Sequence, residues 1–253
     1  MHPIREQFAV SLPANDDTPR YSLILASEPA EIRSVQRLRY EVFAEEMGAT
    51  IESAGGLDAD PLDPYCDHIV VRDDRTGDAV GTYRMLPPDR AAEAGRRYSD
   101  AEFDLAAIAP LQDSLVEVGR SCVHPDHRGG AVIGLMWAGI SRYMLLTGHR
   151  WLAGCASIPL ADGGATAAGV WDRVRAKHLS PAVYRVTPHH RWDDTGVERP
   201  ARLLMPPLLR GYLRLGAWVC GEPAYDAAWR VADLFVLLSV DRIDQRYLRH
   251  FLG

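Results

Sequence analysis

The chain has 253 residues, 47% hydrophobic and 25% charged, which is ordinary for a globular protein with a sizeable core. A formal net charge of −6 argues against general nucleic-acid binding. The N-terminal stretch MHPIREQFAV lacks a long apolar core and no apolar run reaches membrane-spanning length, so we expect a cytoplasmic protein without a signal peptide or membrane span.

The first residues predict an arm followed by one continuous domain. Residues 1–20 are polar and proline-containing, so we expect a flexible arm, and residues 21–253 a single domain. Tyr21–Ser27 is a predicted strand. A helix is expected to open at Pro29, where the missing N–H of proline costs little.

A long acidic loop and a hairpin come next. Residues 47–64 read as a loop, and the aspartates of LDADPLDPY lack the spacing of an EF-hand, so no metal is expected. Cys66–Arg72 and Ala79–Leu86 predict a hairpin, with Arg84 as a charge inside a buried-looking strand. Within residues 98–112, Ser99 and Glu102 form a capping-box pattern that predicts a short helix.

The centre of the chain reads as a strand, a tight basic turn and a helix. The strand is predicted over Leu115–Val123, and the turn HPDHRGG leads into a helix from near Ala131. Glu117 and Arg120 are charges within the strand, and a bulge at Gly119 would turn both toward one cleft. Free N–H groups at such a helix start suit a phosphate, although a turn without a ligand is an equal alternative.

The last part of the chain continues the alternation of strands and helices. Strands are expected at Trp151–Ser157, Ala182–Thr187 and Arg230–Val240, and helices at Gly163–Leu179 and Asp241–Leu252. The stretch PPLLRGYLRL predicts a short basic amphipathic helix that packs on the core or contacts an acidic partner or membrane surface. Neither the dispersed cysteines nor the paired histidines at 189–190 predict a metal site, and the cysteines are expected to be free thiols.

Several motifs resemble known acyltransferases. The turn beginning at Arg128 is similar to the acyl-CoA turn of GNAT enzymes, but Ala131 and Ile133 occupy its two later glycine positions. The runs RYEVF, GTYR and EVGR, with Asp63 and Asp67, resemble acyl-homoserine-lactone synthases. A broader set is similar to the bacterial ornithine N-acyltransferases, over roughly residues 20–250: CDHIVV, VGTYRML, EFDL, EVGRSCVHPDHR, LMWAGI, LAGCASI and MPPLLRGYLRLGAWVCGEPAYD.

The resemblance implies a fold and a reaction. The expected fold is α/β (α+β) and GNAT-like, with a central mixed, strongly twisted sheet flanked by helices. The implied reaction moves a long 3-hydroxylated acyl group from acyl carrier protein to the α-amine of L-ornithine, giving lyso-ornithine lipid. The amine would attack the thioester directly. No bound cofactor is expected, since the phosphopantetheine thioester of the carrier is a co-substrate, with a CoA thioester as the alternative donor.

The resemblance also implies roles for individual residues. Glu117 is the expected base, with an ion pair to an arginine as the alternative, and Arg120 accompanies it in the catalytic set. The expected amino-acid-binding residues are Arg39, Asp63, Asp67 and Arg84. The expected acyl and phosphopantetheine contacts are Phe43, Ser121, Cys122, Val123, Arg128, Gly129, Gly130 and Trp137.

The sequence is compatible with more than one partner and more than one function. An acidic carrier protein would meet an arginine patch, either Arg128, Arg142 and Arg150 or Arg210 and Arg214. Nucleic acid is not an expected partner, and peripheral contact with the inner membrane face is an open alternative. The competing functions are an acyl-CoA-dependent N-acetyltransferase, an N-acyl amino acid or homoserine-lactone signal synthase, and a non-catalytic lipid-binding protein.

Overall fold

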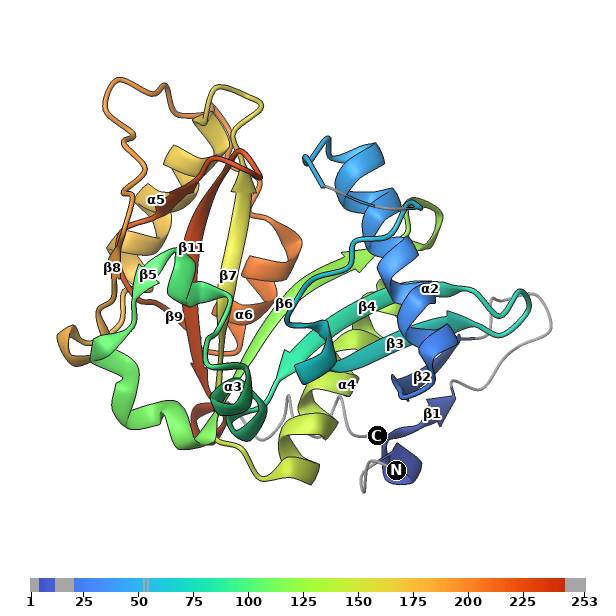
Figure 1. Cartoon of the computed structure of the whole chain (residues 1–253). Helices are drawn as coiled ribbons and strands as arrows, with labels where there is room; N and C mark the ends of the chain where they lie inside the picture. The colour runs from blue at the N-terminus through green and yellow to red at the C-terminus, as the bar shows by residue number, and fades with distance from the viewer. Residues whose placement is uncertain (1–4, 12–20, 52, 54, 244–253) are drawn as a thin grey trace. The chain divides into compact units, whose positions relative to one another are not determined.

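Strands and helices gather into two units in a computed structural model that describes residues 5–11, 21–51, 53 and 55–243 (Figure 1). Unit 1 takes its described residues from Met1–Arg90 and Val118–His149. Unit 2 takes them from Ala91–Glu117 and Arg150–Asp244. The chain therefore crosses from one unit to the other inside the strand that carries Glu117 and Arg120.

Unit 1 is built on a sheet with the strand order β1-β2-β3-β4-β6. Successive pairs from β1 to β4 are antiparallel, with Leu23 opposite Val71 and Val70 opposite Thr82. The strands are β1 (Val10–Ser11), β2 (Tyr21–Ala26), β3 (Asp67–Asp73), β4 (Ala79–Leu86) and the later part of β6 (Leu115–Val123). The predicted hairpin at residues 66–86 is confirmed.

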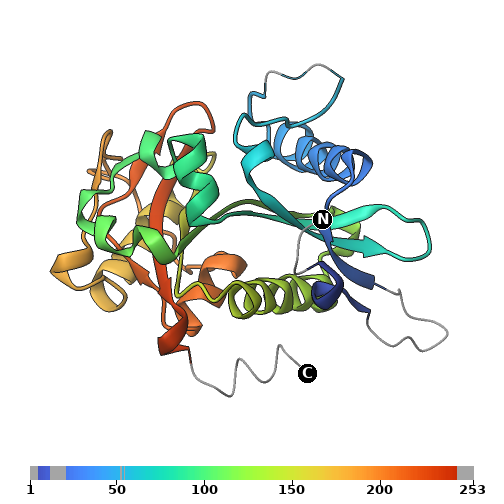
Figure 2. The same ribbon diagram turned by 60° about the horizontal axis from the view of Figure 1, so that its bottom comes forward.

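Helices cover both faces of this sheet, as Figure 2 shows. On one face lies α2 (Pro29–Tyr40), which begins with Pro29 and a capping box between Glu28 and Glu31, and runs on into a π-helical turn over Glu41–Glu46. On the other lies α4 (Gly130–Thr147), preceded by a 3₁₀ turn, Pro125–His127. The short α1 (Arg5–Phe8) precedes β1 in the segment expected to be an arm, and its Phe8 is buried.

Two glycines let α4 approach the sheet closely. A Cβ on Gly81 of β4 would stand 2.8 Å from Val132 Cγ1, and one on Gly139 of α4 would stand 3.0 Å from Ile69 Cγ2. By length and composition α4 is the one described helix that would suffice to cross a membrane, yet its residues Val132, Leu135, Met136 and Ile140 are buried against this unit. It is packed as a core helix.

Unit 2 centres on two long strands, β7 (Trp151–Pro159) and β11 (Val231–Ser239), which pair antiparallel from end to end. The start of β6 joins β7 in parallel through Leu115–Glu117. The short strands β9 (Trp218–Val219) and β10 (Ala224–Asp226) pair with β11, and β5 (Phe103–Asp104) pairs with β8 (Thr187–Pro188). Every residue of β11 is buried, as expected for its nearly continuous apolar run.

The helices of unit 2 are short apart from α5. They are α5 (Ala165–Lys177), α6 (Pro207–Arg214) and 3₁₀ turns over Ser99–Ala101, Ala106–Ser114, Ala182–Tyr184 and Val240–Arg242; α3 (Pro88–Ala94) begins at the end of unit 1's first segment. The core beneath them contains Phe103, Ile108, Leu115, Phe235 and Leu237. Mixed strand pairing with flanking helices confirms the predicted α+β class.

Two local predictions differ from the structure, and a third cannot be compared with it. Ala182–Thr187 is not a strand, because Pro181 starts a 3₁₀ turn in which the Tyr184 N–H bonds the Pro181 carbonyl. The helix expected from Ser99 is only a 3₁₀ turn without the capping box. The helix predicted over 241–252 lies almost entirely outside the described residues.

Candidate active site

Three arginines and three aspartates of unit 1 form a closed ring of alternating charge. Arg39 comes from α2, Arg84 from β4 and Arg120 from β6. The aspartates come from the acidic loop before β3 and its 3₁₀ turn (Asp63–Tyr65). The pairs around the ring are Asp58–Arg39 (3.0 Å), Arg39–Asp63 (2.6 Å), Asp63–Arg84 (3.2 Å), Arg84–Asp60 (3.1 Å), Asp60–Arg120 (2.9 Å) and Arg120–Asp58 (3.2 Å).

Burial makes this arginine–aspartate ring strongly coupled. The Arg39 side chain is fully buried, and the Asp58, Asp63 and Arg84 side chains are almost so. Burial alone would raise the pKa of Asp63, but hydrogen bonds and charge from Arg39 hold that pKa well below its usual range. Burial likewise opposes ionisation of Asp60, and the charge of Arg84 prevails and lowers its pKa. Asp60 and Asp63 therefore stay ionised at neutral pH despite their burial.

Arg120 is held in the ring by a distorted backbone. Its φ of 50° lies in the left-handed region, which β6 would otherwise avoid. Such a conformation costs about 1–3 kcal/mol and persists where the surroundings over-determine it. The backbone departure expected at Gly119 thus occurs one residue later, and it sends the Arg120 guanidinium to Asp58 and Asp60.

Some members of the arginine–aspartate ring were predicted from the sequence as site residues, and others were not. Arg39, Asp63, Arg84 and Arg120 were expected in the site, and the structure brings them together. Asp58 and Asp60 were not, although the acid-rich run LDADPLDPY was the available signal. Asp67 accepts a hydrogen bond from the Tyr143 hydroxyl at 2.7 Å.

The turn between β6 and α4 presents an open helix start. Gly129 is the N-cap of α4 and supplies no side-chain hydrogen bond to its N–H groups. A Cβ on either Gly129 or Gly130 would meet nothing within 4 Å, so space lies in front of this turn. Arg128 turns aside and donates to both carboxylate oxygens of Glu46, at 2.6 and 2.5 Å.

The remaining residues expected near the acyl donor lie on β6, on α4 and in the π-helical turn after α2. Cys122 is buried with Leu38 and Val42, and Phe43 packs against that group. Trp137 is buried on α4, whereas Ser121 and Val123 are half-buried on β6. Burial raises the pKa of the Cys122 thiol, so it behaves as a packing residue rather than a nucleophile.

A pocket of about 570 Å³ with charged walls opens beside the same turn. Arg33 and Arg37 of α2 line it one helical turn apart, and His124 and His127 of the 3₁₀ turn face it from the strand end. The acidic lining residues are Glu41 and Asp78. This pocket was not anticipated from the sequence, because the helical spacing of Arg33 and Arg37 is that of any solvated helix face.

In unit 2, Glu117 is fixed by backbone hydrogen bonds. Its carboxylate is buried and accepts the N–H groups of Tyr98 at 2.7 Å and Ser99 at 2.9 Å. Each oxygen keeps a further lone pair, so the group can still accept a proton. The Ser99 hydroxyl lies 3.4 Å from the Cys155 sulfur. Tyr98 and Ser99 were missed as site residues, since only the fold brings them to β6.

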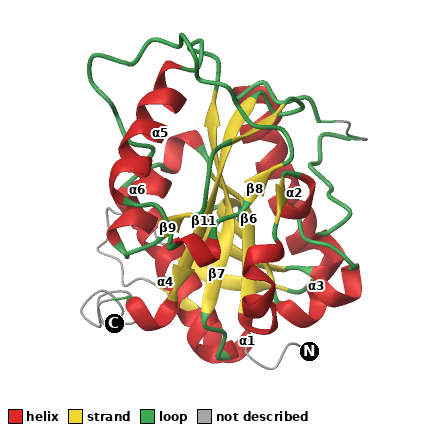
Figure 3. Ribbon diagram, turned by 90° about the vertical axis from the view of Figure 1, so that its left-hand side faces the viewer, coloured by secondary structure: helices red, strands yellow, loops and turns green. Residues whose placement is uncertain are grey.

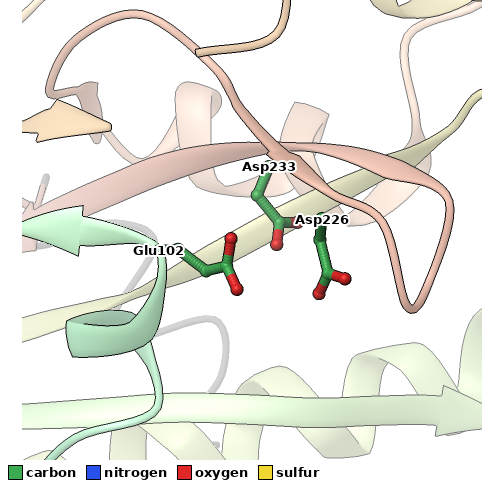
Figure 4. A group of neighbouring side chains, drawn as sticks. All are labelled: Glu102, Asp226 and Asp233. Atoms are coloured by element: carbon green, nitrogen blue, oxygen red, sulfur yellow. The ribbon is translucent and has the colours of Figure 1, made fainter. Parts of the chain in front are cut away.

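Three carboxylates of unit 2 lie close together, as Figure 4 shows. Glu102, Asp226 and Asp233 each offer an oxygen within 4.8 Å of the others. The Tyr98 hydroxyl donates to Asp226 at 3.3 Å. Burial, and then the charge of Asp226, raises the pKa of Glu102. This acidic cluster, which the sequence did not indicate, favours a positively charged neighbour over an anion.

The chain is similar to known acyltransferases. Residues 38–138 match the family described as Acetyltransferase (GNAT) domain. A Rhodobacter capsulatus protein named L-ornithine N(alpha)-acyltransferase is 38% identical over 243 residues, which cover 90% of this chain and 93% of the relative. A Rhizobium meliloti protein of the same name is 35% identical over 264 residues, which cover 96% and 89%.

Solved structures agree on the fold. The CoA-dependent acyl-homoserine lactone synthase BjaI, with SAM and isopentyl-CoA, matches with a TM-score of 0.53 at 17% identity, over 87% of this chain and 79% of that one. An N-acyl amino acid synthase from uncultured soil microbes, FeeM, matches with a TM-score of 0.50 at 14% identity, over 90% and 94%. At these identities the likeness shows a common fold and no more, and it confirms the expected GNAT-like architecture.

Proposed function

The chain belongs to the L-ornithine N(alpha)-acyltransferase family and is an acyltransferase, and from this premise we propose that it acylates the α-amine of L-ornithine with a long 3-hydroxyacyl group from acyl carrier protein. The product would be lyso-ornithine lipid. The observation that carries the proposal is the 38% identity with a relative of that name over 93% of its length.

The proposed reaction needs few protein groups. The α-amine nitrogen attacks the thioester carbonyl, a C–N bond forms, the C–S bond breaks, and the phosphopantetheine thiolate leaves. The ammonium must first lose one proton, which passes through the base to solvent, and the nitrogen loses a second proton as the amide forms, which ends on the departing sulfur. Because the thioester is already activated, no covalent enzyme intermediate is required.

Glu117 is the proposed base of this reaction. Two backbone N–H groups, from Tyr98 and Ser99, orient its carboxylate, and both come from the same unit as Glu117. A base held in this way keeps its position through the proton transfer, which is what general-base catalysis demands. The ring arginines are proposed to act as positioning residues. Arg120, three residues after Glu117 on β6, forms ion pairs with the acidic loop and so fixes that part of the strand.

The acidic cluster is the proposed partner of the substrate's side-chain ammonium. Ornithine carries a second amine, so an enzyme that prefers it over neutral amino acids needs a negative group for that end. Glu102, Asp226 and Asp233 concentrate three carboxylates in unit 2, where Glu117 also lies. The same oxygen ligands would suit a metal ion, and the direct attack proposed here requires none.

The donor is proposed to meet unit 1 at the start of α4. Acyl carrier protein presents one phosphate on its phosphopantetheine arm rather than a pyrophosphate. A single phosphate needs fewer N–H donors than a pyrophosphate. This fits a turn in which Ala131 and Ile133 occupy the two later glycine positions of the acyl-CoA turn. At the neighbouring pocket, the exposed Arg33 and Arg37 of α2 offer charge complementary to an acidic carrier.

The first test incubates the purified full chain with 3-hydroxyacyl carrier protein and L-ornithine, and follows thiol release and acylated product. Release that depends on ornithine supports the proposal. Turnover of acetyl-CoA but of no carrier thioester would replace it with an ordinary acetyltransferase. Release with another amine, and none with ornithine, would keep the acyltransferase and discard the lipid product.

A second test compares the α2 surface beside this pocket with the α6 surface, which is one of the two arginine patches expected from the sequence. Arg33 and Arg37 on α2, and Arg210 and Arg214 on α6, are exposed pairs with the same spacing of four residues. We expect the charge reversal R33E/R37E to raise the KM for acyl carrier protein at least about tenfold and to leave the KM for ornithine unchanged. The matched R210E/R214E variant should change neither, and the opposite pattern would move the carrier to α6.

A further inference from the structure

A groove of unit 2 combines apolar walls with a positively charged rim. It lies where α5 and α6 are neighbours (Figure 3) and has a volume of about 400 Å³. Its lining residues are Leu203, Met205, Leu213, Arg173, His178, Arg210 and Arg214. None of these described lining residues is acidic, although the chain as a whole has a net charge of −6. The local charge of this α5–α6 groove is therefore opposite to that of the molecule.

The helix α6 explains how the rim forms. Leu209 and Tyr212 are buried, so this side of α6 packs on the core. Arg210 and Arg214 lie one turn apart on the exposed side. On α5, Arg173 is exposed and Lys177 follows it one turn later. Burial is the main cause of the lowered pKa of His178, and the charges of Arg173 and Lys177 lower it further. Both helices thus direct cations to the same rim.

Leu204 adds an exposed apolar side chain beside this charge. It is 72% exposed, the highest fraction among the exposed large hydrophobic residues described, and it stands between the two lining residues Leu203 and Met205. An isolated exposed leucine is unremarkable in a soluble protein. Next to an apolar groove with an arginine rim, it gives the pattern of an interfacial anchor, in which apolar side chains enter the bilayer boundary and arginines meet headgroups.

We propose that the α5–α6 groove and Leu204 dock this enzyme on an anionic phospholipid bilayer. Arg173, Arg210 and Arg214 would meet lipid phosphates, and Leu204 would enter the acyl boundary. A bilayer fits better than an acidic protein because the surface joins an apolar patch to its cations, whereas charge alone would serve a carrier. The proposal stands on this surface and does not depend on which thioester donates the acyl group.

The test is co-sedimentation of the full chain with vesicles of phosphatidylcholine, with and without phosphatidylglycerol. We expect binding only when the anionic lipid is present, and weaker binding as salt is raised. R210E/R214E and Leu204→Asp should each weaken that binding at least about tenfold. R33E/R37E, an equivalent charge reversal on α2, should leave it unchanged, and circular dichroism confirms that each variant is folded.

Three outcomes would overturn the docking proposal. The first is no binding to vesicles with phosphatidylglycerol. The second is equal loss in R33E/R37E and R210E/R214E, which would mean nonspecific attraction. The third is unchanged vesicle binding in R210E/R214E and Leu204→Asp while the KM for acyl carrier protein rises, which would assign the groove to the carrier. Failure of the ornithine reaction alone leaves the vesicle result standing, so the two proposals are judged separately.

Discussion

Arg39 donates hydrogen bonds from both terminal nitrogens to the two carboxylate oxygens of Asp63, at 3.1 and 2.6 Å, with both side chains buried. This bidentate pairing combines two parallel hydrogen bonds with the attraction of opposite charges. The pair joins α2 to the acidic loop, and the ring extends that link to β4 and β6 through Arg84 and Arg120.

Breaking this pair is expected to destabilise the protein strongly. Asp63→Asn leaves Arg39 and Arg84 buried with less compensating charge, which typically costs about 3–5 kcal/mol. Urea denaturation measures the change in the free energy of unfolding. Asp126→Asn, at a side chain that is 85% exposed, is the control and should change that free energy by less than about 0.5 kcal/mol. Equal, small effects in both variants would show that the ring does not hold the fold.

His68 is expected to make stability depend on pH. Burial lowers its pKa to about 4, and the unfolded value is about 6.5. The unfolded chain therefore takes up the proton first, so the free energy of unfolding falls as pH drops from about 6.5 to about 4, by roughly 3 kcal/mol. The lowered pKa of Asp63 acts in the same direction at more acidic pH, below about 4.

Proton NMR of the histidine rings tests the lowered pKa of His68 directly. One ring should titrate near pH 4 in the folded protein, and its signal should disappear in His68→Gln. Removing the exposed His189 with His189→Asn should leave that transition in place. A histidine set that titrates entirely between pH 6 and 7 would contradict the expectation.

Glu117→Gln is expected to lower kcat for ornithine acylation by about 10²–10⁴-fold, the usual contribution of a positioned base. The amide keeps the size of the side chain, and one oxygen can still accept the backbone N–H groups of Tyr98 or Ser99. Steady-state kinetics over a range of pH measures the loss, together with the acidic limb of the profile. Glu222→Gln, at a half-exposed side chain, serves as the control. Full activity in a folded Glu117→Gln protein would assign Glu117 a structural role alone.

Asp233→Asn is expected to erode the preference for a cationic substrate side chain. The comparison is kcat/KM for ornithine against norvaline, which has the same chain length without the terminal ammonium. Loss of one carboxylate from the acidic cluster should lower the ornithine value at least about tenfold and leave the norvaline value nearly unchanged. An equal decrease for both amino acids would indicate damage to the fold of β11, where Asp233 lies.

Gly81→Ala is expected to destabilise unit 1 by about 1–3 kcal/mol, because the new methyl group would stand 2.8 Å from Val132 Cγ1 and 3.3 Å from Met136 Sδ. Gly134→Ala, on the same helix α4, provides a control of opposite sign. A Cβ there meets nothing within 4 Å, so alanine should stabilise the helix by about 0.5–1 kcal/mol. Urea denaturation of both variants decides the matter, and destabilisation of similar size in both would contradict the close approach of α4 to β4.

The elements with strong periodicity were predictable, and the irregular ones were not. The hairpin β3–β4, the helix α4 and the buried strand β11 follow from local patterns that match their tertiary surroundings. The segment 182–187 has β-forming residues, yet Pro181 and Pro188 enclose it and its backbone closes a 3₁₀ turn instead. The shorter the element, the more its neighbours decide its conformation.

The candidate site likewise contains residues that the sequence predicts and residues that it does not. Charged residues inside apolar strands, Arg84, Glu117 and Arg120, were visible from the sequence because a buried charge is costly unless it has a use. Their partners were not visible, since Asp58 and Asp60 read as ordinary loop residues and Tyr98 acts through its backbone N–H. Partner choice depends on distances across the fold, which no spacing along the chain encodes.

By itself, the sequence determined the family, the α+β class and the residues whose burial would need compensation, because motifs and periodicities are local properties of the chain. Only the tertiary structure decided that six charges close into one ring, that Glu102, Asp226 and Asp233 meet, and that arginines from α5 and α6 share one groove. Those arrangements join residues far apart in the chain, and electrostatic interactions depend on separation in space and on burial.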